Sequence, residues 1–215
     1  MAGGYRLSAE DVAYWYLRLN GFLVLRNFLV HGDGSSDVRT EIDIVGVRFR
    51  YRKEHLENPM IDADWLTKSD STVVVFCEVK ARRGDFNPSW LKSSRRMLES
   101  FLAFVGVVPE SRWSDVAREL YSNGYCRAEK HLIITALLIH GAGEAGEEDQ
   151  WKAAPRIKLR SALSFMHARF TDHGNLKRDH SQWEESGSRL LDLFDQFEKS
   201  RSGFEDFILA EIGAE

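Results

Sequence analysis

The stretch Ser71-Thr72-Val73-Val74-Val75-Phe76-Cys77-Glu78-Val79-Lys80 decides how the rest of the chain is interpreted. Its first part is almost continuously apolar and rich in β-branched residues, which is typical of a central strand covered on both faces. Side chains alternate along a strand, so we expect Glu78, Lys80 and Arg82 on one face and Val79 on the other. The stretch therefore predicts a buried strand that ends in charged residues.

Two further strands are expected before this one. Residues 22–30 and 40–49 are both rich in β-branched and large apolar residues, and the glycine-rich residues 31–36 separate them. This pattern predicts a hairpin. Glu41 and Asp43 would share one face of its second strand.

Pairing of the two acidic strands would bring Asp43 and Glu78 together. Carboxylates are hard oxygen ligands of the kind that Mg²⁺ and Mn²⁺ prefer. Phosphodiester cleavage requires a metal to neutralise phosphate charge and to help generate hydroxide, with a cation such as Lys80 nearby to hold the water. The three residues predict a metal-dependent hydrolytic site. The competing interpretation is a structural ion pair; burial at the end of the strand favours the metal site, because a buried charged pair is costly without further partners.

The remaining pattern gives the element order α-β-β-β-α-(α)-β. A capping-box sequence at Ser8 predicts the first helix, and helical spacing of apolar residues follows the central strand, before a last buried strand. We expect an α/β fold with a central mixed sheet flanked by helices. The polar segment between the second and third strands has the character of an insertion. The expected units are a core over 1–140, a linker over 141–150 and a helical C-terminal extension over 151–215, with helices near 158–170, 181–199 and 203–212.

Composition excludes several classes of protein. The 215 residues are 43% hydrophobic and 12% aromatic, as in ordinary globular domains. The two cysteines, Cys77 and Cys126, have no zinc-site spacing, so structural zinc and a secreted disulfide scaffold are not expected. No apolar run is long enough to span a bilayer, and the N-terminal sequence has no signal-peptide pattern. We therefore expect no membrane partner and a cytoplasmic location.

Charge is unevenly distributed along the chain. The formal net charge of −4 argues against nucleic-acid binding through a general positive field. A local basic segment nevertheless follows the central strand, and its members are candidate phosphate contacts: Arg82, Arg83, Lys92, Arg95 and Arg96. The alternative for the last three is an ordinary solvated helix face. Residues 181–215 are strongly acidic, so the C-terminal helices are expected to face water or a protein partner.

The chain resembles the PD-(D/E)xK nucleases, the superfamily with the restriction-endonuclease-like αβββαβ core, and among them the Holliday-junction resolvases and related small bacterial proteins. The resemblance covers residues 5–140. The matching features are a leading helix with Glu10, the turn Asn20-Gly21-Phe22, the pair Arg26-Asn27, the segment Glu41-Ile42-Asp43-Ile44 and the segment Phe76-Cys77-Glu78-Val79-Lys80-Ala81-Arg82. Ile42 stands where the proline that names the superfamily would precede Asp43, and residues 50–71 lengthen the connection between the acidic strands.

The resemblance implies a role for each matching residue. Asp43 and Glu78 would bind Mg²⁺ or Mn²⁺ together with the carbonyl of Val79. Lys80 would orient the attacking water, and Glu10 would be an outer acid near the metal.

Two functions are therefore expected. The first is a metal-dependent endonuclease that hydrolyses DNA phosphodiester bonds, structure-specific in repair or recombination, or of a restriction or defence type. Cutting both strands would need two sites, which favours a two-fold homodimer. The alternative is a nuclease-fold protein that does not cut and binds nucleic acid or a protein partner through its acidic helical tail.

Overall fold

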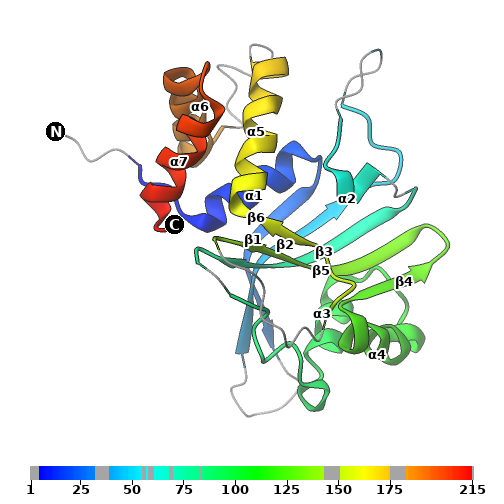
Figure 1. Cartoon of the computed structure of the whole chain (residues 1–215). Helices are drawn as coiled ribbons and strands as arrows, with labels where there is room; N and C mark the ends of the chain where they lie inside the picture. The colour runs from blue at the N-terminus through cyan, green and yellow to red at the C-terminus, as the bar shows by residue number, and fades with distance from the viewer. Residues whose placement is uncertain are drawn as a thin grey trace.

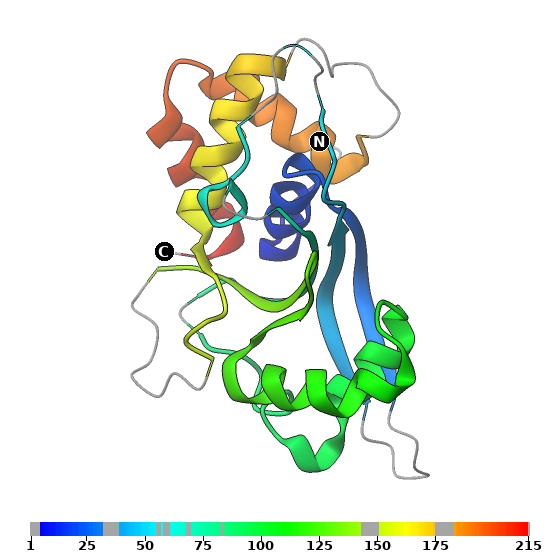
Figure 2. The ribbon, with the colours of Figure 1, turned by 90° about the vertical axis from the view of Figure 1, so that its right-hand side faces the viewer.

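A six-stranded mixed sheet with helices on both faces forms the centre of the molecule (Figures 1 and 2). The computed structural model describes residues 5–31, 39–54, 57, 61–67, 70–82, 84–142, 151–174 and 183–214. The α/β class, the mixed sheet and its flanking helices are as the sequence predicts.

The strands follow the order β1-β2-β3-β5-β4, and β6 also pairs with β5. Neighbouring strands β1, β2 and β3 are antiparallel, β5 is parallel to β3 and β6, and β4 runs antiparallel to β5. The predicted hairpin of β1 with β2 and the predicted pairing of β2 with β3 are confirmed. The strands are β1 (Leu23–His31), β2 (Arg39–Arg48), β3 (Thr72–Lys80), β4 (Tyr125–Glu129), β5 (Leu132–His140) and β6 (Arg156–Lys158).

The helices agree with the apolar spacing in the sequence, and two short strands, β4 and β6, are additional. In the segment expected as an insertion, the described residues include one short helix, α2. The helices are α1 (Ala9–Leu19), α2 (Asp64–Thr67), α3 (Met97–Val105), α4 (Trp113–Asn123), α5 (Leu159–His173), α6 (Glu185–Phe197) and α7 (Arg201–Ile212), with 3₁₀ turns η1 (Ser93–Arg95) and η2 (Glu110–Arg112). None of the helices in the described ranges is long and apolar enough to cross a membrane.

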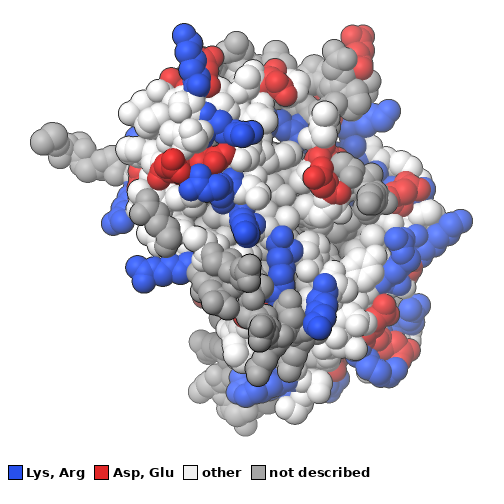
Figure 3. Space-filling model, in the orientation of Figure 1, with Lys and Arg blue, Asp and Glu red and all other residues white. Residues whose placement is uncertain are grey.

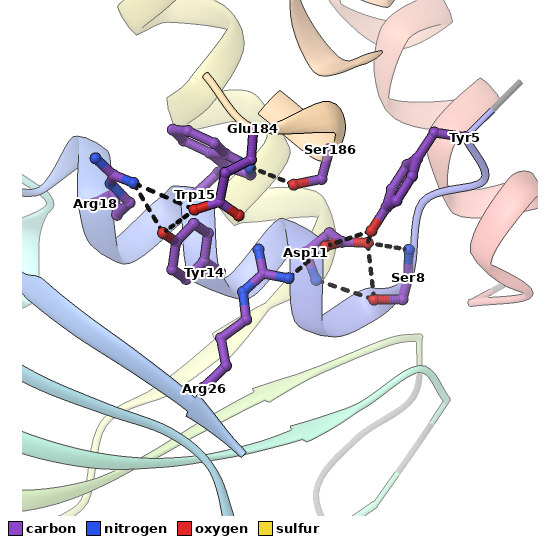
Figure 4. A network of polar contacts seen from close by, with 9 residues as sticks. All are labelled: Tyr5, Ser8, Asp11, Tyr14, Trp15, Arg18, Arg26, Glu184 and Ser186. Atoms are coloured by element: carbon purple, nitrogen blue, oxygen red, sulfur yellow. Dashed lines mark hydrogen bonds and ion pairs between the residues drawn. The ribbon is translucent and has the colours of Figure 1, made fainter. Parts of the chain in front are cut away.

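The capping box at the start of α1 forms as predicted. The Ser8 hydroxyl accepts a hydrogen bond from the Asp11 backbone N–H at 3.1 Å, and the Asp11 carboxylate accepts one from the Ser8 N–H at 2.9 Å. Asp11 also accepts hydrogen bonds from the Tyr5 hydroxyl and, at 2.7 Å, from Arg26 of β1 (Figure 4). The first turn of α1, which carries Glu10, is therefore fixed against the sheet.

One hydrophobic core, under α1, includes the C-terminal helices. Trp15 of α1 stacks on Trp183 with ring centroids 4.5 Å apart. The Trp15 indole N–H donates to the Ser186 hydroxyl at 2.9 Å, as Figure 4 shows. Buried residues of this core extend from Leu7 to Ala214. Most of the expected linker, residues 143–150, lies outside the described residues. The segment that follows it is helical as expected, yet it packs on the same sheet face as α1 and adds β6 to the sheet.

The opposite face of the sheet carries a second core beneath α3 and α4. Phe76 of β3 lies at its centre, with its ring centroid 5.2 Å from that of Phe101 in α3 and 5.7 Å from that of Trp151. Both faces of β3 are therefore covered, which explains its continuous apolar sequence.

Candidate active site at the carboxyl end of β3

Strands β2 and β3 separate at the point where the sequence places its acids. Their register runs from Arg48 opposite Val73 to Ile44 opposite Cys77, and no further pair follows. One residue beyond the last pair, the Asp43 carboxylate accepts a hydrogen bond from the Val79 backbone N–H at 2.6 Å. A side chain thus satisfies a backbone donor that the strand pairing leaves open.

The backbone conformation of β1 is unusual opposite Asp43. Asn27 lies between Arg26, which is opposite Ile44, and Phe28, which is opposite Ile42, so its place across the hairpin is that of Asp43. Its φ is +53°, in the left-handed region that Asn tolerates better than most residues. Strand β1 therefore departs from regular geometry beside the candidate site.

Glu78 and Lys80 share a face of β3, as predicted. Val79 points to the opposite face of the sheet and packs into the core under α1. The Lys80 ammonium forms a short ion pair with the Glu78 carboxylate. Glu78 is only 7% exposed. The acid and the base that end the strand are thus in contact.

Burial raises the pKa of both carboxyl groups at the site. For Asp43, burial is the main cause, and the charges of Glu10 and Glu41 raise its pKa further, whereas the Val79 N–H and Lys80 lower it. Burial also raises the pKa of Glu78; contact with Lys80 and the backbone N–H of Asn87 lowers it, and the charge of Asp43 raises it. The carboxylates of Asp43 and Glu78 thus repel each other at a partly buried site, where a cation would stabilise their ionised forms.

The sequence-predicted acids therefore lie near one another. Glu10 is half-buried in the first turn of α1, and its negative charge raises the pKa of Asp43. Glu41 is exposed, and its negative charge also raises the pKa of Asp43. Cys77 of β3 is fully buried, and burial raises the pKa of its thiol well above the usual value. A buried, protonated thiol has no nucleophilic role here.

The predicted basic residues are distributed differently. Arg82 does not continue the face of Lys80, because β3 ends at Lys80; its guanidinium instead donates to the Gly213 carbonyl at 3.4 Å, at the end of α7. Arg83 lies outside the described residues. Lys92, Arg95 and Arg96 are exposed as expected, but they belong to the turn η1 and its flanks and precede α3, and Arg96 has a φ of +50°.

The set of donors can be compared with what a divalent cation requires. Within the described ranges, no three Asp, Glu, His or Cys side chains gather closely enough to hold a metal ion. Asp43 and Glu78 supply two crowded carboxylates, and hard carboxylate oxygens fit Mg²⁺ or Mn²⁺. These cations commonly use one or two carboxylates and keep several waters, so two carboxylates fit such an ion.

The sequence did not identify the loop that follows β3 as part of the site. The backbone N–H of Asn87 contacts Glu78, and Asp85 forms an ion pair with Arg156 of β6 at 3.1 Å. A Cβ atom on Gly84 would lie 2.6 Å from the Lys80 side chain, so Gly84 leaves the space that Lys80 occupies. The glycine itself was the available signal.

A well-formed cavity lies elsewhere. It measures about 810 Å³ and is lined by residues of α1, α2 and α5, among them Tyr16, Trp65, Phe165 and Arg169. Neither Asp43 nor Glu78 contributes to it. The carboxylates of the candidate site are therefore separate from this cavity.

Comparison of the chain with protein-family models, with curated proteins and with solved structures gives no match.

Proposed function

We propose that this protein is a metal-dependent endonuclease that hydrolyses DNA phosphodiester bonds on a restriction-endonuclease-like core. The observation that carries the proposal is the placement of Asp43 where β2 and β3 separate, beside the Glu78–Lys80 pair. The order α1, β1, β2, β3, α3, β5 also agrees with an αβββαβ core, with β5 parallel to β3.

The residues of the site divide the chemistry among them. Asp43 and Glu78, with the carbonyl of Val79, would hold Mg²⁺ or Mn²⁺, which neutralises phosphate charge and lowers the pKa of bound water when present. Lys80 would orient the attacking water and stabilise the negative charge that develops on the phosphate. Glu10 would add a further negative charge behind Asp43 and strengthen cation binding.

The alternative function, a non-cleaving protein that binds through an acidic tail, has less support. Several acids of the C-terminal helices contact groups of their own chain. Glu205 is buried and interacts with Arg160 and Ser164, and Glu211 accepts hydrogen bonds from the Leu7 N–H and from Arg189. These acids stabilise the fold, so they do not form a free surface for a partner.

Cleavage of a panel of nucleic acids tests the proposal. Linear duplex, single strand, flap, four-way junction and RNA would be incubated with Mg²⁺ or Mn²⁺. We expect cleavage of at least one DNA substrate by the wild-type protein and its loss, by at least about a hundredfold, in Asp43→Ala and Lys80→Ala.

Lys130→Ala is the matched control, because Lys130 is exposed and precedes β5, at the end of the sheet away from Lys80. It should cut like the wild type. Equal cleavage by wild type and Lys80→Ala would refute the assignment, as would silence of the wild type on every substrate.

A further inference from the structure

A second lysine lies in the same row of the sheet as Lys80. At the carboxyl ends of three parallel strands, Lys80 of β3 is in register with His140 of β5, and His140 is in register with Lys158 of β6. The row joins residues that are far apart in the sequence. It places a basic side chain on either side of a histidine.

The neighbouring rows show which face these side chains occupy. Val79, Ile139 and Ile157 form the preceding row, and all three pack into or against the core under α1. Side chains of successive residues point to opposite faces, so the row of Lys80 and Lys158 faces away from α1. Glu78 and Arg156 lie on that same face, two residues before the lysines.

Electrostatics places the positive charges close together. Burial lowers the pKa of His140, and the charges of Arg156 and Lys158 lower it further, so both cations lie near the ring, with Asp85 acting in the opposite sense. His140 is only 4% exposed, and its ring contacts the Gly141 carbonyl oxygen at 3.0 Å. Arg156 is held by Asp85.

Lys158, by contrast, is available to a ligand. It is exposed, and among the residues with described positions it forms no ion pair. In the space-filling view of Figure 3, Lys and Arg side chains lie across the middle of the face that Figure 1 shows, in the region of β6. This part of the surface offers positive charge beside the acidic site.

We infer that Lys158 binds a backbone phosphate of the substrate strand, at a distance from the scissile phosphate that lies at Lys80. This inference rests on the proposed function. Adjacent strands are about 4.8 Å apart, so Lys80 and Lys158 are separated by about 10 Å across the sheet. A duplex strand advances about 3.4 Å along the axis for each nucleotide and also winds around that axis, so this separation reaches at most about three nucleotides from the scissile phosphate. The substrate strand crosses the carboxyl edge from β3 to β6.

Binding measurements with Lys158→Ala test this inference. The probe is a short fluorescein-labelled DNA duplex, with the labelled single strand beside it, titrated in Ca²⁺ or EDTA over a series of salt concentrations. We expect Lys158→Ala to weaken binding several-fold and to reduce the slope of log K against log salt by about 1, as for one lost phosphate contact. Lys130→Ala makes the same change in net charge at the other end of the sheet and should alter neither quantity.

The outcomes separate the two proposals. If wild type binds and cleaves while Lys158→Ala has an unchanged affinity and salt slope, the phosphate contact is refuted and the nuclease remains. Equal losses in Lys158→Ala and Lys130→Ala would also refute it, because they would reflect net charge alone. If the wild-type protein binds neither probe, the proposed function fails and the contact fails with it.

Discussion

Asp43 connects the local fold to the chemistry of the site. Its carboxylate accepts a hydrogen bond from the Val79 N–H, which the strand pairing leaves open, and its charge acts on Glu78. A neutral residue with a carbonyl oxygen could accept the same hydrogen bond. The negative charge is therefore not required by the backbone, and its burial is a cost to the fold.

Replacing Asp43 by Asn should stabilise the metal-free protein near pH 8. The folded-state pKa of Asp43 is raised above the ordinary value of 3.8, so the folded protein holds this proton more tightly than the unfolded chain. The free energy of unfolding therefore falls as pH rises from that ordinary value through the raised one. Urea denaturation in EDTA at several pH values measures the effect. A variant less stable than wild type at pH 8 would contradict it.

Divalent cations should reverse the order of stability, so that the wild-type protein becomes more stable than Asp43→Asn. A ligand that binds only the folded state at one hundred times its Kd adds about 2.7 kcal/mol to the free energy of unfolding. At about 2–4 °C per kcal/mol for a chain of this size, wild-type Tm should rise by several degrees in excess Mg²⁺ or Mn²⁺. Asp43→Asn should show little rise, and Lys130→Ala the full rise. The same rise in Asp43→Asn and wild type would place the cation elsewhere.

The loop after β3 positions Lys80. Because a Cβ atom on Gly84 would lie 2.6 Å from the Lys80 side chain, Gly84→Ala requires that side chain to move. We expect kcat to fall about tenfold or more with a change in Tm of only a few degrees. Gly106→Ala is a control, because a Cβ atom there meets nothing within 4 Å, although its φ of +66° favours glycine. Unchanged kcat in Gly84→Ala would show that Lys80 tolerates the shift.

Asp11 provides a polar attachment of helix α1 to the sheet, in addition to the buried apolar residues of the helix. This carboxylate completes the capping box and forms an ion pair with Arg26, which also lies over the Tyr14 ring at 3.7 Å (Figure 4). Two other guanidinium nitrogens of Arg26 are buried and have no hydrogen-bond partner among the described residues. Asp11 is therefore the main compensation for a partly buried positive charge.

Removing Asp11 should consequently cost more than removing the cap alone. Ser8→Ala should lower the free energy of unfolding by about 1 kcal/mol, the usual effect of losing an N-cap side chain. Asp11→Ala also leaves Arg26 without its ion pair and should cost about 3 kcal/mol or more. Urea titrations compare the two variants. Equal losses would show that the Arg26 contact contributes little.

Most elements could be predicted from the sequence, because alternation and helical spacing are local properties. Glu78 and Lys80 fall on one face for that reason, whereas Arg82 does not, since the strand ends at Lys80. Strand β6 has only three residues and follows Pro155, so its sequence gave little periodic signal. The row that joins Lys80 to Lys158 depends on register between distant segments, which no local pattern contains.

At the scale of the whole molecule, the C-terminal helices are part of one core with α1. Leu190, Phe194 and Phe204 are buried in the same cluster as Trp15. Deleting residues 143–215 would expose this cluster and remove β6 from the sheet. We expect the truncated chain, ending at 142, to lack a cooperative thermal transition and any nuclease activity, as measured by circular dichroism and cleavage. A folded, active product would instead make the helices a separable extension.

The contact of Trp15 with Ser186 also constrains the order of events in the cell. The two residues are 171 positions apart, and chains grow at roughly 5–20 residues per second, so α1 waits on the order of ten to thirty seconds for this partner. During that interval the part of α1 that packs against the C-terminal helices has no native cover. A nascent chain is therefore expected to depend on holding factors until late in synthesis, and the core that α1 shares with the C-terminal helices forms only afterwards.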